Sequence, residues 1–221
     1  MNTRWIANNT DEILGRVGEH LVFSIVPVVI ALLISIPLGY LIHRTGRTSS
    51  VWLALFGLLY AIPSVALFVT MPLLLGTKIL DPINIIAALV IYSIALLVRS
   101  VVDGFRRVDE QVRQAAVAMG YGDLRRVLTV ELPLAMPVIF SGLRVVTVSN
   151  IALVSVGAVI GMGALGQYFD QGFREGFYTP IFVALLLILV IALLADLLIL
   201  LLQRITLPWF GLGERTREAT A

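Results

Sequence analysis

The stretch LVFSIVPVVIALLISIPLGYLI, residues 21–42, decides the fold class because it contains no charged residue. A helix needs about 20 apolar residues to cross the hydrocarbon core of a bilayer, and this run has that length. Similar apolar runs recur along the chain. We therefore predict an all-α polytopic membrane protein with about five transmembrane helices. The expected spans are residues 21–42, 51–75, 83–102, 134–166 and 181–202.

The composition of the 221-residue chain supports this fold class. Hydrophobic residues make up 59% and charged residues 14%, and the mean hydropathy is +0.98. A water-soluble protein of this length could not bury so many apolar side chains. A net charge of +2 offers no basic surface for nucleic acid. The sequence has no cysteine and only two isolated histidines, so we expect neither a metal site nor a bound cofactor.

The distribution of cations predicts the orientation in the membrane. Eleven of the 16 Lys and Arg residues fall on one side of the five spans and four on the other, while Arg144 lies inside the fourth span. Because the cation-rich side is normally cytoplasmic, residues 1–20 are expected outside and the C-terminus inside. For residues 1–20 we expect a polar external lead-in, and an interfacial helix within it is an open alternative. For residues 203–221 we expect a cytoplasmic tail. The alternative that residues 133–143 form a separate segment, which would allow an even number of spans, stays open.

The longest polar stretch, residues 103–132, is patterned as two short helices rather than as a slack linker. Small residues at 115–119 would form one helix face, Gly120-Tyr121-Gly122 would break it, and Asp123 would cap a second helix ending before Pro133. Such a hairpin is suited to entering a groove on another protein. An amphipathic connector lying at the membrane interface is the alternative.

The same loop resembles the EAA loop of ABC-importer permeases. Gln114-Ala115-Ala116 is followed by Gly120 and by Leu132-Pro133 at the spacing of that loop. Two departures are Gln114, where the pattern usually has Glu, and Val130, where it usually has Ile. The missing carboxylate puts one ion pair of the family in doubt. The residues assigned to ATPase coupling by this resemblance are Gln114, Ala115, Ala116, Met119, Gly120, Tyr121, Gly122, Leu132 and Pro133.

Three further segments are similar to the glycine betaine/choline/carnitine subfamily of these permeases. They are residues 61–67 (AIPSVAL), 131–137 (ELPLAMP) and 160–166 (IGMGALG), and the resemblance covers roughly residues 21–172. It implies a type I importer permease of a prokaryotic cell membrane that works with a second permease subunit, a cytoplasmic ATPase dimer and an external substrate-binding protein. The sequence has no G-x-x-x-x-G-K-[ST] loop, so ATP would be hydrolysed by the partner chain and this chain would not be an enzyme.

Several polar residues and prolines within the spans are candidates for a translocation path. Proline frees backbone carbonyls in a membrane helix, although most such prolines are packed kinks. For a single hydroxyl, a bond between helices is the simpler interpretation, whereas for Asn150 we expect a pathway role. The candidate residues are Pro63, Ser64, Ser149, Asn150 and Ser155. The segment 161–166 matches G-x-G-x-x-G, but it ends a membrane span and lacks the βαβ context of a dinucleotide site.

Arg144 and Asp196 are charges of opposite sign at similar depth in the fourth and fifth spans. An unpaired charge at the centre of a membrane helix costs about 2.5–3.5 kcal/mol on insertion scales, so we expect neither to face lipid alone. One interpretation pairs them and joins the two spans. In the other interpretation, Asp196 faces a partner subunit or water, and the Arg144 side chain extends to the inner membrane interface.

The function expected from this sequence is the permease subunit of an ATP-driven osmoprotectant importer. A permease for another small solute, such as an amino acid, is the first alternative. A stand-alone secondary transporter would require ion coupling, for which Asp196 is the only intramembrane carboxylate. An intramembrane hydrolase is less consistent still, because neither His20 nor His43 is placed deep enough to serve as a base.

Overall fold

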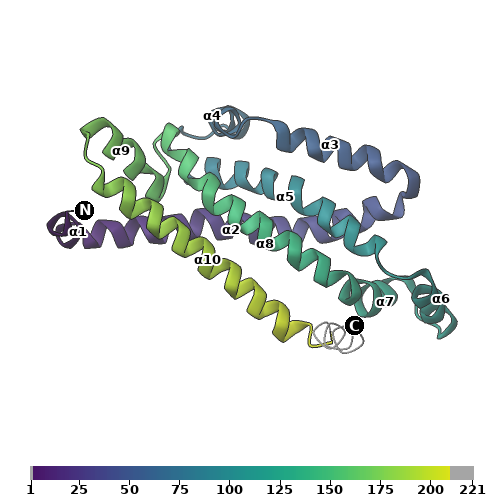
Figure 1. Ribbon diagram of the computed structural model, residues 1–221. Helices are drawn as coiled ribbons and strands as arrows, with labels where there is room; N and C mark the ends of the chain where they lie inside the picture. The colour runs from purple at the N-terminus through teal and green to yellow at the C-terminus, as the bar shows by residue number, and fades with distance from the viewer. Residues whose placement is uncertain (1, 210–221) are drawn as a thin grey trace.

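The computed structural model describes residues 2–209, and its regular elements in that range are all helices (Figure 1). The elements are α1 (Thr3–Asn8), α2 (Thr10–Arg44), a 3-10 turn (Gly46–Thr48), α3 (Ser49–Ala61), α4 (Ser64–Leu75), α5 (Pro82–Arg106), α6 (Glu110–Ala118), α7 (Asp123–Arg126), a π turn (Val127–Glu131), α8 (Leu132–Val156), 3-10 turns (Gly157–Ile160 and Ala164–Gly166), α9 (Gln167–Glu175) and α10 (Thr179–Thr206). Most of the expected tail, residues 210–221, lies outside the described residues.

Within residues 2–209, four helices are long and apolar enough to cross a membrane, and a bent pair, counted as one span, brings the number to five. The four are α2, α5, the continuous helix Asp123–Ile160 and α10. This confirms the prediction of an all-α polytopic membrane protein with about five spans. The small helices α1 and α9 lie at one end of the bundle, and α6 and α7 lie at the other end (Figure 1).

Helix α5 is the centre of the packing and contacts α2, α3, α4 and α8. Its side chains Leu89, Leu97 and Val101 are fully buried. Glycines let the neighbouring helices come close, because a Cβ at Gly39 of α2 would lie 2.6 Å from Cγ1 of Val101. A Cβ at Gly104 would likewise lie 2.9 Å from a backbone carbonyl of α8. Close approach through small residues is the usual packing of membrane helices.

The second expected span, residues 51–75, is bent rather than straight. Helices α3 and α4 meet at an angle of 94°. Ile62 and Pro63 are both extended, with ψ angles of 131° and 130°. Proline disfavours the helical conformation of the residue before it and cannot donate a backbone hydrogen bond, so the helix stops at this point. The uniformly apolar sequence on both sides concealed this break.

The first and fourth spans also differ in extent from the expectation. Helix α2 starts at Thr10 and continues for 35 residues, so part of the predicted lead-in is continuous with the helix of the first span. The helix that contains the fourth span runs from Asp123 to Ile160, which is longer than a membrane crossing needs, so it also includes the second arm of the loop at 103–132. This continuity removes the alternative of a separate segment at 133–143. Residues 161–166, expected at the end of that span, form a tight turn instead.

Candidate functional site

A glycine corner joins α6 to α7 at one end of the bundle (Figure 1). Gly120 has φ +82°, a left-handed conformation that costs other residues about 1–2 kcal/mol. Its N–H donates to the Val117 carbonyl at 2.9 Å, and the N–H of Tyr121 donates to the Ala116 carbonyl at 3.1 Å. These two bonds form a Schellman motif, which ends α6 and reverses the chain. The predicted helix break is therefore made by Gly120 itself.

We define the hairpin as residues 110–131. Its tip, at the Gly120 corner, is an exposed apolar surface. Met119 is 69% exposed and Leu124 is 74% exposed, and Val117 is also exposed. Beside them the Arg125 guanidinium lies 4.6 Å from the ring centroid of Tyr121. Apolar side chains grouped at a protruding corner and bordered by charge are typical of a protein-binding surface.

The two alanines expected at this surface face opposite ways. Ala116 is buried within the hairpin, whereas Ala115 is exposed. Ala116 therefore packs inside the hairpin, and a coupling role for the two alanines stays a prediction. Gln114 is exposed and lines a shallow cavity of about 460 Å³. The other residues around that cavity are Glu110, Arg113, Val117, Ala118 and Arg126.

A buried carboxylate, Glu131, holds the base of the hairpin together. Its side chain is only 3% exposed and lies between two arginines of the hairpin arms. Nε of Arg126 donates to Oε1 of Glu131 at 2.8 Å, and Nε of Arg113 lies 3.3 Å from Oε2. A buried carboxylate needs such compensation because it has been removed from water. Sequence reasoning missed this cluster, although an acidic residue within the apolar stretch after residue 127 was a usable signal.

Arg113 also connects the hairpin to the ends of two spans. Its Nη2 donates to the Phe105 carbonyl at 2.6 Å and lies 3.1 Å from Nε2 of His43. Phe105 lies in the last turn of α5 and His43 in the last turn of α2, and their rings stack with centroids 5.9 Å apart. A single side chain of α6 therefore contacts the ends of α2 and α5 while facing the carboxylate that precedes α8.

Leu132 and Pro133 lie inside a continuous helix, not at its start. The residues before them form a π turn, Val127–Glu131, in which the N–H of Leu132 donates to the carbonyl of Val127. In a regular α-helix the ring of Pro133 would clash with the carbonyl four residues earlier. The wider π turn accommodates it. The expectation that the second arm of the hairpin ends before Pro133 is corrected accordingly.

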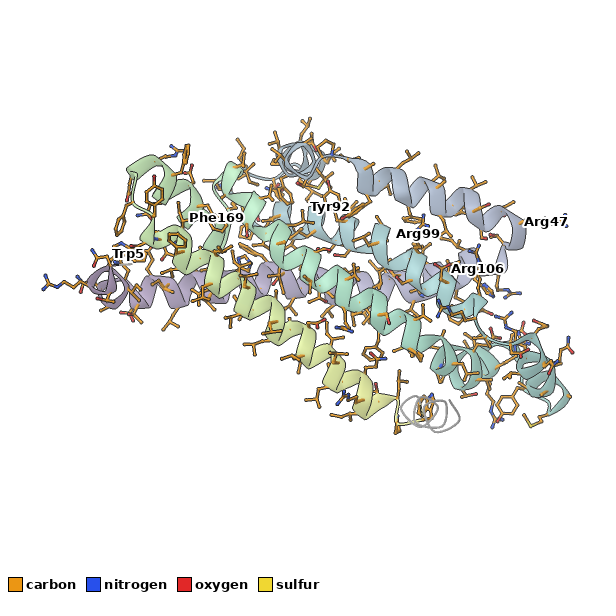
Figure 2. All side chains as sticks on the ribbon, in the orientation of Figure 1. Trp5, Arg47, Tyr92, Arg99, Arg106 and Phe169 are labelled. Atoms are coloured by element: carbon orange, nitrogen blue, oxygen red, sulfur yellow. The ribbon has the colours of Figure 1, made fainter. Side chains whose placement is uncertain are left out.

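The candidate pathway residues Pro63 and Ser64 lie at the corner between α3 and α4. Pro63 is exposed and Ser64 is partly exposed. The hydroxyl of Tyr92, on α5, donates to the Ile62 carbonyl that the break leaves without a helical partner. Figure 2 shows Tyr92 between α5 and this corner. The corner is therefore a fixed feature anchored to α5, and a pathway role for it stays a prediction.

The other three candidate pathway residues lie on the fourth span. Asn150 is buried, and its side-chain amide donates to the hydroxyl of Ser93 at 2.8 Å. In this structure the Asn150 side chain joins α8 to α5 inside the subunit, and its expected pathway role stays a prediction. Ser149 and Ser155 are partly exposed and each lines a shallow cavity, so their role stays a prediction.

Arg144 and Asp196 form an ion pair between α8 and α10. Nε of Arg144 donates to Oδ1 of Asp196 at 2.6 Å, and Nη2 donates to Oδ2 at 2.8 Å. Two parallel bonds of this kind are the strongest common geometry between a guanidinium and a carboxylate. Of the two interpretations from the sequence, this structure adopts the pair.

The glycine-rich segment after α8 is a packing turn. Gly161 has φ +80°, and a side chain at Gly163 or Gly166 would collide with the backbone of Ala158 or Ser155. The next helix, α9, carries Tyr168, whose pKa is raised by burial. The segment is enclosed by its own backbone, which agrees with the rejection of a dinucleotide site.

Comparison with known proteins identifies the family. The family described as binding-protein-dependent transport system inner membrane component matches residues 21–206. The chain belongs to this family. The match spans the five membrane crossings and the hairpin, so this chain is a membrane-embedded permease subunit of ABC transporters rather than a complete transporter.

The relatives of this permease include proteins named for osmoprotectant transport. It is 28% identical over 180 residues, 81% of each chain, to the choline transport system permease protein OpuBB of Bacillus subtilis (strain 168). It is 31% identical over 207 residues to the osmoprotectant import permease protein OsmW of Salmonella typhimurium (strain LT2), covering 92% of this chain and 96% of that protein.

Solved structures with the same fold support the architecture of the permease. A chain of the MetNI methionine ABC transporter in an inward-facing conformation aligns with a TM-score of 0.77 at 23% identity, over 88% of this chain and 96% of that one. An amino acid ABC transporter aligns with a TM-score of 0.74 at 17% identity, over 92% and 98%. These likenesses confirm the type I importer permease fold.

Proposed function

We propose that this permease subunit imports an osmoprotectant, such as glycine betaine, choline or carnitine, in an ATP-driven transporter. ATP is bound and hydrolysed by a cytoplasmic ATPase dimer, and a second permease subunit completes the membrane part. An external binding protein delivers the solute. The family and the names of the relatives support this proposal, since several of these are choline, carnitine or osmoprotectant permeases.

The observation that carries the proposal is the exposed apolar tip of the hairpin at the Gly120 corner. Met119 and Leu124 project from it, and the base is joined directly to the long helix that contains α8. A soluble partner docked on this tip can move the fourth span, because no flexible linker separates the two. The excess of cations at this end of the spans supports a cytoplasmic position for the hairpin, where ATP is available, and an external position for residues 1–20.

The test replaces Gly120 by valine. The left-handed φ of Gly120 is strained for any side chain and most of all for a β-branched one, while no atom lies within 4 Å of the added Cβ. Gly120→Val should therefore abolish ATP-driven uptake in vesicles and weaken copurification of the ATPase without reducing membrane insertion. Gly122→Ala is the matched control, because Gly122 has φ −69° and ψ 161° in open space.

Full uptake and undiminished ATPase copurification by Gly120→Val would place the coupling surface elsewhere. Gln114→Glu, which restores the carboxylate of the resembled loop, should retain activity because Gln114 is exposed at the cavity of the hairpin.

A panel of osmoprotectants and amino acids, tested for uptake in the same vesicles, decides the solute class. Uptake of an amino acid, and of no osmoprotectant, would reject the proposed substrate.

A further inference from the structure

The Arg144–Asp196 pair is unusual in its position. Arg144 is the midpoint of α8, with 12 residues on either side, so it lies about 18 Å along the helix from each end. Asp196 meets it from α10, ten residues before the end of that helix. Both charges therefore lie well inside long apolar helices, about 15–18 Å from the nearest helix ends, where an ionisable side chain is costly and is typical of a functional site.

The pair is also open rather than enclosed. The side chain of Arg144 is 36% exposed and that of Asp196 is 23% exposed. Together they border a shallow cavity of about 440 Å³ on α8 beside α10. The remaining residues around it are Ser141, Val145, Val148 and Ser149. The exposed edges of both side chains leave them accessible to water, a solute or another subunit.

The surroundings of the cavity differ sharply from the neighbouring surface. The outward face of α10 is exposed and apolar, as Leu189, Leu193 and Leu197 illustrate, and is suited to lipid. The cavity instead presents two hydroxyls and a cation from about two turns of α8 and a carboxylate from α10. Polar groups of this kind at membrane depth are stable where they border water, a solute or another subunit.

From this geometry we propose that the Arg144–Asp196 pair is a transit site for a small zwitterion or quaternary ammonium cation. This inference rests on the proposed function and assigns to it a position inside the membrane. A solute carboxylate binds the outer edge of the Arg144 guanidinium, and a solute cation lies against the Asp196 carboxylate. The two hydroxyls, of Ser141 and Ser149, provide further donors and acceptors at the rim.

Both side chains of the pair have hydrogen-bonding groups left for a solute. The contacts to Asp196 use Nε and Nη2 of Arg144, so two of the five guanidinium N–H groups are engaged and three remain for a ligand. Each carboxylate oxygen of Asp196 retains a lone pair. Among residues 2–209 no aromatic side chain lines the cavity, so recognition by these residues depends on charge and not on cation–π contacts. Such a site binds weakly and broadly, which suits a solute that must leave again.

A single-cysteine experiment tests the cavity directly, since the natural sequence contains no cysteine. Ser149→Cys should react with a charged, membrane-impermeant thiol reagent in open proteoliposomes, and glycine betaine should slow that reaction about 10-fold at saturation. Leu193→Cys, on the apolar face of α10, should not react. Ser50→Cys, exposed beyond the end of α2, should react at a rate that glycine betaine does not change.

An unreactive Ser149→Cys would mean that lipid or a partner subunit covers the cavity, and it would overturn the proposal. A reactive Ser149→Cys with no protection by glycine betaine, choline or carnitine would also overturn it, leaving a water-filled space without a site. Neither result depends on ATP-driven uptake. Absence of osmoprotectant uptake by the wild-type complex would instead reject the proposed function.

Transport kinetics supply the second measurement. The double variant Arg144→Gln/Asp196→Asn removes both charges, so neither is left unpaired in the membrane. Its KM for glycine betaine should rise about 10- to 100-fold while its ATPase copurification is unchanged. Asp196→Asn should weaken uptake of choline as well, whereas Arg144→Gln should affect glycine betaine more than choline, which has no carboxylate. An unchanged KM in the double variant would make the pair a purely structural contact.

Discussion

Replacing Glu131 by glutamine removes the buried charge at the base of the hairpin while keeping the side-chain size. The glutamine carbonyl can still accept from Arg126, but its amide N–H groups would face the N–H groups of Arg113 across a gap that is now 3.3 Å. The contact that is lost is the ion pair between Arg113 and Glu131, and breaking a fully buried pair costs about 3–5 kcal/mol. The two arginine side chains are about one-fifth exposed, so water compensates in part.

We therefore expect Glu131→Gln to lower the free energy of opening of the hairpin by about 2–3 kcal/mol. Hydrogen exchange of the backbone amides in residues 110–131, measured in reconstituted protein, should accelerate about 30- to 150-fold. Glu110→Gln is the matched control. It makes the same chemical change beside Arg113, but the Glu110 side chain is 65% exposed and its contact is 3.4 Å. Equal exchange in the two variants would refute the assignment of Glu131 as the carboxylate that holds the hairpin.

Three further outcomes are expected. Tyr92→Phe should lower the free energy of unfolding by about 0.5–1.5 kcal/mol, because the Ile62 carbonyl at the α3–α4 corner loses its hydrogen-bond donor. An unchanged unfolding temperature would contradict this. Gly39→Ala should destabilise by about 1–3 kcal/mol through overpacking against α5, whereas Gly57→Ala, with open space around it, should not; equal unfolding midpoints would contradict the close approach. A topology reporter fused after Ala221 should be located on the cytoplasmic side, and one inserted at Lys78 should be located outside. The reverse pattern would overturn the predicted orientation.

The membrane fold followed from the sequence because its determinants are local. A charge-free run of about 20 residues has few stable alternatives to a membrane helix, and Gly120 marks a corner because glycine adopts the left-handed conformation without strain. Arg144 and Asp196 were recognised as a candidate pair for a similar reason. Two opposite charges at matched depth in apolar helices have few other partners, although the sequence left open whether they meet.

The features that escaped prediction depend on packing between distant segments. Pro63 was recognised as unusual, but an apolar run does not reveal whether proline kinks a helix or ends it. The π turn before Pro133 leaves no periodic signal over five residues. Asn150 would have the same sequence context in a pathway or in a buried bond, and only the position of Ser93 on α5 distinguishes them. Glu131 became significant only when two arginines from the hairpin arms were found beside it.

The π turn at Val127–Glu131 gives the long helix one residue more than an α-helical path would need. If that turn tightened to α-helical hydrogen bonding, the helix beyond it would rotate by about 100° and advance by about 1.5 Å. The helix is continuous to Ile160, so the rotation would carry Arg144 around the axis, away from Asp196. A change of register confined to five residues beside the hairpin would then alter the polarity of a cavity inside the membrane.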